Sequence, residues 1–420
     1  FFIGRSVGML GNAATNVAFP LTIICTAISL LCGIGGAANF NLAMGAGEEK
    51  RAKTCVGNVV NMMLSLGILL CLITQLFLEP MMHAFGATSD ILDYALSYTG
   101  ITSWGFPFLI LTTAGSHLIR ADGSPRFSML CTLTGAIINT ILDPLFIFGF
   151  QLGIQGAAYA TVIGQIISAV MVIAYLTHFK TVKLSFSDLR PDFSYWLKIL
   201  SLGMTPCLNQ VAMMVVQIVM NNTLTYYGRN SVYGSEVPLA CAGIISKVGM
   251  IFFSLVIGTS QGLQPLVSFN YGAGKYRRVR ESFRKASIIC LIISVLAFVC
   301  FQAFPRQIIQ IFGSGTEEYY HFAEQYFRIY LFFTFVNFLQ PLAANFFTSI
   351  GKPVRGIFLS LTRQIIFLLP LLIILPLIMG IDGVMYSAPI ADFMAAALSI
   401  LFVLMEMNAL KKRETGKPDV

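Results

Sequence analysis

Long apolar runs follow one another along most of the chain and are separated by short polar segments. Runs of about 20 apolar residues are long enough to cross the ~30 Å hydrocarbon core of a bilayer as α-helices. They lack the alternating pattern of the other structure that spans membranes, the closed β-barrel. The sequence therefore predicts an all-α polytopic membrane protein with eleven spans, at about 13–44, 55–78, 94–118, 127–150, 154–176, 197–223, 237–268, 286–304, 327–350, 356–379 and 384–407.

The composition supports this class. Of the 420 residues, 56% are hydrophobic and 11% are charged, whereas about 25% are charged in an ordinary soluble protein. This balance excludes a soluble enzyme, a disordered chain and a fibrous protein. The nine cysteines lie in or beside apolar runs and form no CxxC pair. We interpret them as small packing residues rather than as a disulfide framework.

The distribution of Lys and Arg predicts the orientation. Of the 27 basic residues, 21 fall in one set of alternating loops and the C-terminal tail, and four fall in the opposite set. Basic residues are retained on the cytoplasmic side of a membrane. We therefore expect a multi-pass protein of the cell (inner) membrane with a cytoplasmic C-terminus, including the tail at 411–420.

The chain also repeats itself at an offset of about 227 residues. Gly45-Ala46-Gly47 recurs as Gly272-Ala273-Gly274, and Gly123 with Pro125 recurs as Gly351 with Pro353. Six spans in the same order in each half indicate a parallel repeat, related by an axis along the membrane normal. We expect an N-terminal lobe at 1–177, a cytoplasmic linker at 178–194 and a C-terminal lobe at 195–410.

The repeat makes a further prediction about the start of the chain. The opening Phe1-Phe2-Ile3-Gly4-Arg5 matches a segment of the second half that about 30 residues precede. We interpret it as the stub of a first span whose body is missing. The chain would then hold eleven full spans plus this stub, and the intact protein would have twelve spans.

Four ionisable residues lie inside predicted spans, where charge is costly and is therefore a sign of function. Asp143 is about 16 residues from the start of its span, or ~24 Å along the helix. Asn139 precedes it by one turn, and Pro144 leaves the carbonyl of Thr140 without its helical partner. Such oxygen ligands suit a small cation, and the carboxylate could instead bind a proton. The structural alternative is a carboxylate that only satisfies backbone groups at the proline.

The other three ionisable residues, Lys247, Arg363 and Asp392, belong to the second half and are predicted at mid-depth. A carboxylate between two cations would offset part of their burial cost. The cluster is either a structural ion-pair network or a second coupling or gating site, and the sequence leaves both readings open.

Six segments in order resemble the multidrug and toxic compound extrusion (MATE) family of secondary transporters, most closely the prokaryotic branch of DNA-damage-inducible and MepA-like proteins. They are FFIGRSVG at 1–8, IRADGSPRFSM at 119–129, NTILDPLFIFG at 139–149, SQGLQPLVSFNYGAGKYRRV at 260–279, SIGKPVRGIFLSLTRQ at 349–364 and GIDGVMYSAPIADF at 380–393. The resemblance covers the whole chain apart from the expected first span.

The resemblance implies an exporter that antiports organic cations or drugs against Na⁺ or H⁺ by rocking-type alternating access. It also implies that Asn139 and Asp143 form the cation site, assisted by Thr161 and Tyr98, with Thr140 beside them. We expect no cofactor other than the coupling ion, and a monomer in contact with lipid. The alternative within the superfamily is a flippase for lipid-linked oligosaccharides.

Other classes fit less well. A major facilitator transporter also has two parallel six-span halves, but the SxGKP and LDP segments do not match it. An enzyme is not expected, because the sequence holds no HExxH, GxSxG or P-loop motif. The basic loops follow from the membrane orientation, so no nucleic-acid partner is expected.

Overall fold

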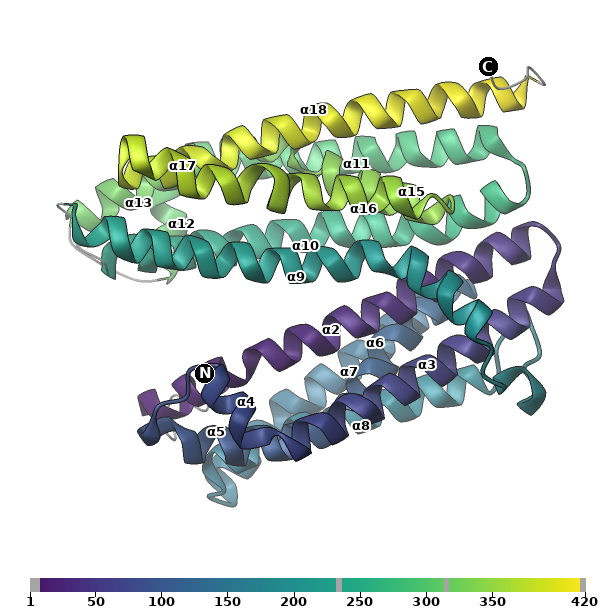
Figure 1. Ribbon diagram of the computed structural model, residues 1–420, viewed down its shortest axis with the longest axis horizontal. Coiled ribbons are helices and arrows are strands. Elements are labelled where there is room, and N and C mark those ends of the chain that lie inside the picture. The colour runs from purple at the N-terminus through teal and green to yellow at the C-terminus, as the bar shows by residue number, and fades with distance from the viewer. Residues whose placement is uncertain (1–7, 232–235, 313–316, 416–420) are drawn as a thin grey trace. The chain divides into compact units, whose positions relative to one another are not determined.

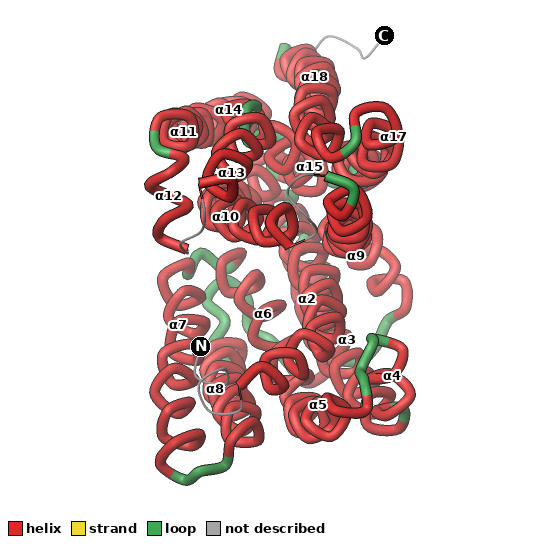
Figure 2. The backbone as a smooth tube through the Cα atoms, turned by 90° about the vertical axis from the view of Figure 1, so that its left-hand side faces the viewer, coloured by secondary structure: helices red, strands yellow, loops and turns green. Residues whose placement is uncertain are grey.

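The computed structural model describes residues 8–231, 236–312 and 317–415. Within these ranges the chain is helical, and no strand occurs (Figure 2). The predicted stub of a first span, at Phe1–Arg5, lies outside the described residues. The all-α class predicted from the apolar runs is confirmed.

Nine helices of the described chain are long and apolar enough to cross a membrane, and one bent pair could form a tenth span. The bent pair covers the predicted span 327–350 and turns by 41° between Tyr330 and Thr334. The predicted span 94–118 is helical but divided by a short 3₁₀ turn, Ser103–Gly105. Pro107 explains this division, because it has no N–H to bond the carbonyl of Ser103.

The chain divides into two compact units, Phe1–Cys207 and Leu208–Val420. The first unit contains the following helices (Figure 1): α2 (Gly8–Gly45), α3 (Glu49–Leu76), α4 (Leu78–Ala84), α5 (Ser89–Thr102), α6 (Phe106–Ala121), α7 (Pro125–Pro144), α8 (Gly153–Leu176) and the start of α9 (Phe193–Arg229). Many of their large apolar side chains, such as Ile68, Leu72 and Ile141, point out of the unit and are exposed. Such an exterior suits lipid rather than water.

Within the described residues, the second unit contains the rest of α9 and the following α-helices: α10 (Glu236–Gly272), α11 (Tyr276–Ala303), α12 (Pro305–Phe312), α13 (Glu317–Tyr330), α14 (Thr334–Asn337), α15 (Leu339–Ser349), α16 (Pro353–Leu361), α17 (Leu369–Met379) and α18 (Ile381–Glu414). Its core is rich in phenylalanine. Phe346, for example, packs at 4.7 Å from Phe283 and 5.7 Å from Phe347, measured between ring centroids.

The helix ends show the internal repeat at the level of single backbone angles. Gly47 and Gly274 have φ values of 78° and 69°, and Gly123 and Gly351 have 79° and 76°. Each of these glycines follows the end of a helix, where a left-handed residue closes the last turn and glycine adopts that conformation without strain. The matching segments of the two halves therefore adopt the same cap.

The polar stretch predicted as a linker packs against the first unit. The buried carboxylate of Asp122 accepts hydrogen bonds from the backbone N–H groups of Lys180 and Thr181, at 2.8 and 3.0 Å, and from the hydroxyl of Tyr175 at 2.7 Å. Asn58 accepts a bond from the N–H of Asp192 at 2.7 Å. The two compact units divide inside α9, after Cys207.

Two glycines allow α9 to lie directly against α2. A Cβ atom at Gly203 would lie 1.8 Å from the carbonyl oxygen of Leu31, and one at Gly35 would lie 2.1 Å from that of Ile199. Only a residue without a side chain fits at such distances. The amide of Asn39 strengthens the crossing by donating to the carbonyl of Lys198 at 3.1 Å.

We expect Gly203→Ala to destabilise the protein by about 2 kcal/mol, because the added methyl group must push two helix backbones apart. The matched control is Gly258→Ala on α10, where a Cβ atom would have no neighbour within 4 Å. Alanine is the better helix former, so the control should be neutral or slightly stabilising. Thermal unfolding of the detergent-solubilised protein would measure both. Equal melting temperatures for the two variants would contradict the proposed crossing.

Candidate functional site

The site predicted in the first half is assembled by α7 and α8. Asn139 and Asp143 lie one turn apart on α7, and the amide nitrogen of Asn139 is 3.3 Å from a carboxylate oxygen of Asp143. The same nitrogen is 3.3 Å from the hydroxyl oxygen of Thr161 on α8. All three side chains are half-buried. The structure thus brings together the three central residues of the predicted site.

Small residues allow α7 and α8 to approach closely enough for this contact. A Cβ atom at Gly164 of α8 would lie 2.7 Å from the carbonyl oxygen of Gly135 on α7, so the two backbones approach closely. One turn further along, Ser168 donates a hydrogen bond to the carbonyl of Cys131 at 2.8 Å. The close contact places the polar face of α7 directly against Thr161.

Pro144 ends the regular part of α7, and the chain continues as a π-helical turn over Leu145–Gly149. Proline has no N–H, so the carbonyl four residues earlier, that of Thr140, loses its helical partner. Wide turns of this kind occur often at functional sites. The local break predicted from Pro144 is therefore present beside Asp143.

The two other predicted residues differ in their placement. Tyr98 of α5 is half-buried and lies close enough to Thr161 and Asp143 to interact with both. Thr140 is exposed, and its hydroxyl donates to the carbonyl of Ala136 on its own helix at 2.8 Å. Its side chain is thus directed away from the cluster, because it lies about 100° around the helix from Asn139.

The donor set fits a small hard cation. One nitrogen of Asn139 contacts both the carboxylate of Asp143 and the hydroxyl of Thr161. A cation at that position would contact the same two oxygens, and rotation of the amide would add its own oxygen. Carboxylate, amide and hydroxyl oxygens are typical ligands of such ions.

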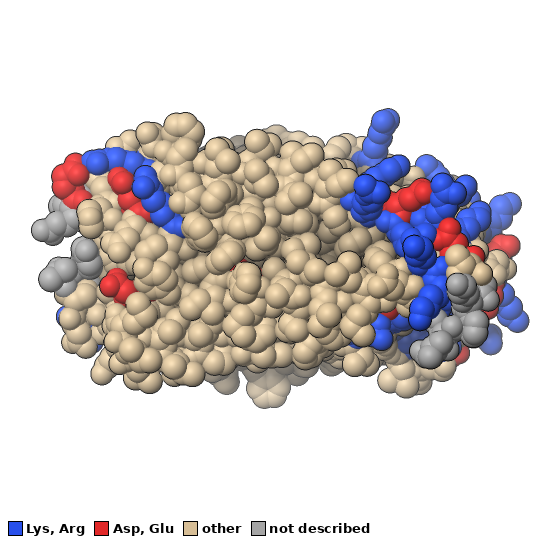
Figure 3. Space-filling view, turned by 90° about the horizontal axis from the view of Figure 1, so that it is seen from above, with Lys and Arg blue, Asp and Glu red and all other residues tan. Residues whose placement is uncertain are grey.

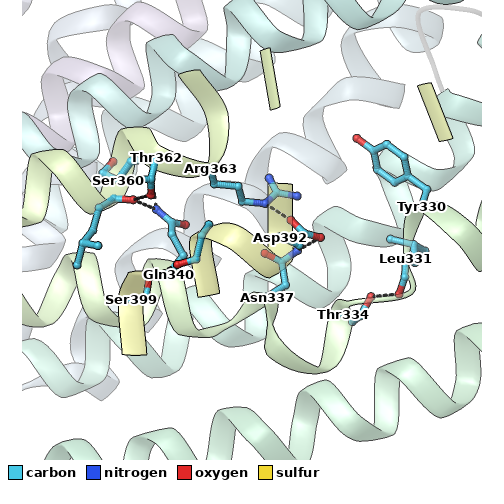
Figure 4. Close-up of polar contacts among 12 residues, drawn as sticks. Tyr330, Leu331, Thr334, Asn337, Gln340, Ser360, Thr362, Arg363, Asp392 and Ser399 are labelled. Atoms are coloured by element: carbon cyan, nitrogen blue, oxygen red, sulfur yellow. Dashed lines mark hydrogen bonds and ion pairs between the residues drawn. The ribbon is translucent and has the colours of Figure 1, made fainter. Parts of the chain in front are cut away.

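A second polar network lies in the other unit (Figure 4). Arg363, in the π-helical turn Thr362–Leu368, donates through Nε to the carboxylate of Asp392 on α18 at 2.5 Å. Asn337, at the end of α14, donates to the other oxygen of that carboxylate at 3.2 Å. The Asp392 side chain is 3% exposed and that of Arg363 is 12% exposed. The guanidinium also lies 5.8 Å from the ring centroid of Phe253.

Lys247, which was predicted as the third member of this charged cluster, does not join Arg363 and Asp392. It is exposed on α10, and it forms no ion pair with any residue in the described part of the chain. The sequence analysis did not identify Asn337. An amide side chain within an apolar run is a signal of such a role, but a weak one. The sequence analysis also missed Glu406, which is 1% exposed and paired with Lys352 at 2.6 Å and Arg355 at 2.7 Å.

Two helical units with exposed apolar exteriors define a polytopic membrane protein. The sequence profile of the MatE family matches residues 1–145 and 206–374. The chain belongs to this family.

Relatives and solved structures agree with this assignment. The chain is 25% identical over 415 residues to the multidrug export protein MepA of Staphylococcus saprophyticus, covering 97% of this chain and 90% of MepA. It is 26% identical over 410 residues to MepA of Staphylococcus haemolyticus, covering 96% and 88%.

Among solved structures, a MOP superfamily transporter from Pyrococcus furiosus superposes with a TM-score of 0.88 at 20% identity, covering 98% of this chain and 94% of the other. A structure described as MATE in the bent conformation gives a TM-score of 0.90 at 20% identity, covering 98% and 90%. The fold is thus that of the MATE transporters.

Proposed function

We propose that the protein is a secondary active multidrug exporter of the cell membrane, which antiports organic cations or drugs against Na⁺ or H⁺. The observation that carries the proposal is the placement of the Asn139 amide between Asp143 and Thr161 on two facing helices. The names of the MepA relatives support the substrate class.

The cluster can couple an ion to a drug through competition. A single carboxylate in a medium of low polarity balances one cation far more cheaply than two. An organic cation and the coupling ion would therefore exclude each other from Asp143. Ion binding would also draw α7 and α8 together around Asn139 and Thr161, and so favour one conformation of a rocking transporter.

The direct test uses the purified protein in lipid vesicles loaded with a fluorescent organic cation. A Na⁺ gradient and a proton gradient are imposed separately, and efflux is followed in each. Efflux driven by one gradient and absent without any gradient supports the proposal and identifies the ion. Efflux independent of both gradients, or movement of a lipid-linked sugar instead of the drug, would replace it with another mechanism.

We further propose that the basic ends of the helices are cytoplasmic, as the excess of Lys and Arg indicates. In cells, a cysteine at Ser89 should then react with a membrane-impermeant maleimide, whereas one at Lys183 should react only after permeabilisation. Both parent side chains are exposed. The unsubstituted chain is the control, because its native Cys300 is also exposed. The opposite labelling pattern would reverse the orientation.

A further inference from the structure

One face of α11 is exposed and apolar along most of its length. Its exposed side chains recur at helical spacing, as Ile288, Ile292, Val295, Leu296 and Val299. In a membrane protein such a stripe lies against lipid tails. One turn before Ile288 the same face carries Arg284 and Lys285, and both are exposed. The stripe thus ends in two cations.

The last helix, α18, repeats this arrangement. Its exposed apolar stripe includes Ile400, Leu401, Leu404 and Met405. Two turns beyond Met405 the same face carries Lys411 and Lys412, which are also exposed. Because α18 runs in the opposite direction to α11, the basic end of one helix lies beside the basic end of the other (Figure 1).

Direct contacts hold these two ends together. Arg280 of α11 forms an ion pair with Glu414 of α18. Arg413 of α18 donates a hydrogen bond to the hydroxyl of Tyr271, at the end of α10, at 3.1 Å. The spacing between the two pairs of cations is therefore set by the fold rather than by flexible loops.

The charge of this surface is only partly compensated. The nearby carboxylate of Glu281 is paired with Arg277, and that of Glu414 is paired with Arg280. No ion pair within the described ranges involves six neighbouring basic residues: Lys275, Arg278, Arg284, Lys285, Lys411 and Lys412. Figure 3 shows a large group of Lys and Arg at one end of the visible face and a smaller group, mixed with Asp and Glu, at the other, with a largely uncharged surface between them.

We propose that the adjoining basic ends of α11 and α18 bind the headgroup of an anionic phospholipid. The phosphate would contact Arg284, Lys285, Lys411 and Lys412, and the acyl chains would lie along the two apolar stripes. Basic clusters directly beside a spanning helix attract anionic lipids. Basic residues are in excess on one side of membrane proteins in general. That excess alone does not require them to lie at the end of a lipid-facing apolar stripe, as they do on α11 and α18.

The test uses fluorescent phosphatidylglycerol and fluorescent phosphatidylcholine, titrated separately into the detergent-solubilised protein. The unsubstituted protein should bind phosphatidylglycerol at least ~10-fold more tightly. The variant Arg284→Gln/Lys285→Gln/Lys411→Gln/Lys412→Gln should lose this preference, so that its affinity for phosphatidylglycerol falls at least ~10-fold, to that for phosphatidylcholine. Inorganic phosphate at the same concentration should not displace the lipid.

Two matched variants control for folding and for overall charge. Lys183→Gln/Arg190→Gln removes two exposed cations from the segment before α9, away from any lipid-facing stripe, and should retain the preference. Arg284→Lys/Lys285→Arg keeps the charge and should also retain it. Equal binding of the two lipids by the unsubstituted protein would overturn the proposal. So would an equal loss in the Lys183/Arg190 variant, or displacement by inorganic phosphate.

Discussion

Replacement of Asp143 by Asn should abolish gradient-driven efflux while leaving a folded protein in the membrane. The substitution keeps the size of the side chain and removes the charge that, in the proposed mechanism, the ion and the drug share. If the carboxylate supplies the main attraction for both, transport should fall by roughly 100-fold, which corresponds to about 2.7 kcal/mol. Efflux from vesicles, normalised to the amount of protein, measures this loss.

The neighbouring ligands should matter less. Asn139→Ala and Thr161→Ala each remove one neutral group, so each should weaken coupling by about 10-fold or less, as expected for a single hydrogen-bonding group. The matched control is Asp90→Asn, which makes the same substitution at an exposed position in the first turn of α5 and should leave efflux unchanged.

Binding measurements separate a role in coupling from a role in structure. Ion and drug that compete must weaken each other by the same factor, because the two affinities are linked. Drug affinity measured against Na⁺ concentration and pH should show this competition in the unsubstituted protein and lose it in Asp143→Asn. Competition that persists in the variant would exclude Asp143 and direct attention to Asp392.

The second large effect is expected at Asp392. Its replacement by Asn would leave the guanidinium of Arg363 buried without a counter-charge, which typically costs about 3–5 kcal/mol. Thermal unfolding should show this loss of stability. The matched control is Glu281→Gln, which breaks the exposed pair with Arg277 and should cost less than about 1 kcal/mol.

A double variant decides what the network does. Arg363→Met/Asp392→Leu removes both charges and should recover most of the stability, because no unpaired ion remains. If the recovered protein also transports, the pair is structural. If it is stable but transports without coupling, the pair takes part in coupling or gating. A single variant Asp392→Asn as stable as the parent would contradict the ion pair itself.

The sequence predicted the helices well because apolar length is a local property. The turns that divide two spans were also encoded locally, although the predicted spans did not show them. Pro107 removes a backbone donor to Ser103, where the 3₁₀ turn begins. Pro341 removes one to Asn337, where α14 ends and α15 follows. The 41° turn between Tyr330 and Thr334 lies before this point and has no such proline. The glycine pairs of the repeat, such as Gly47 and Gly274, share their positive φ angles because their caps are also local.

The sites were predictable only in part, because they depend on contacts between distant segments. Charge compensation was enough to pair Arg363 with Asp392, but no charge pattern distinguishes Lys247, which has no such partner in the described chain. The meeting of Asn139 with Thr161 requires the close approach of Gly135 and Gly164, which spacing alone does not reveal. It was expected only through the family resemblance.

The polar stretch at 178–194 packs onto the first unit, and this packing determines where the chain can be cut into two self-contained fragments. A chain cut in that stretch would leave Gly203, and with it one wall of the first unit, on the wrong fragment. If two such fragments were produced together, the first unit would be complete only when the start of α9, carried by the second fragment, packed against the first fragment. The covalent connection between the units is therefore the helix α9, which carries Pro206 at the point of division.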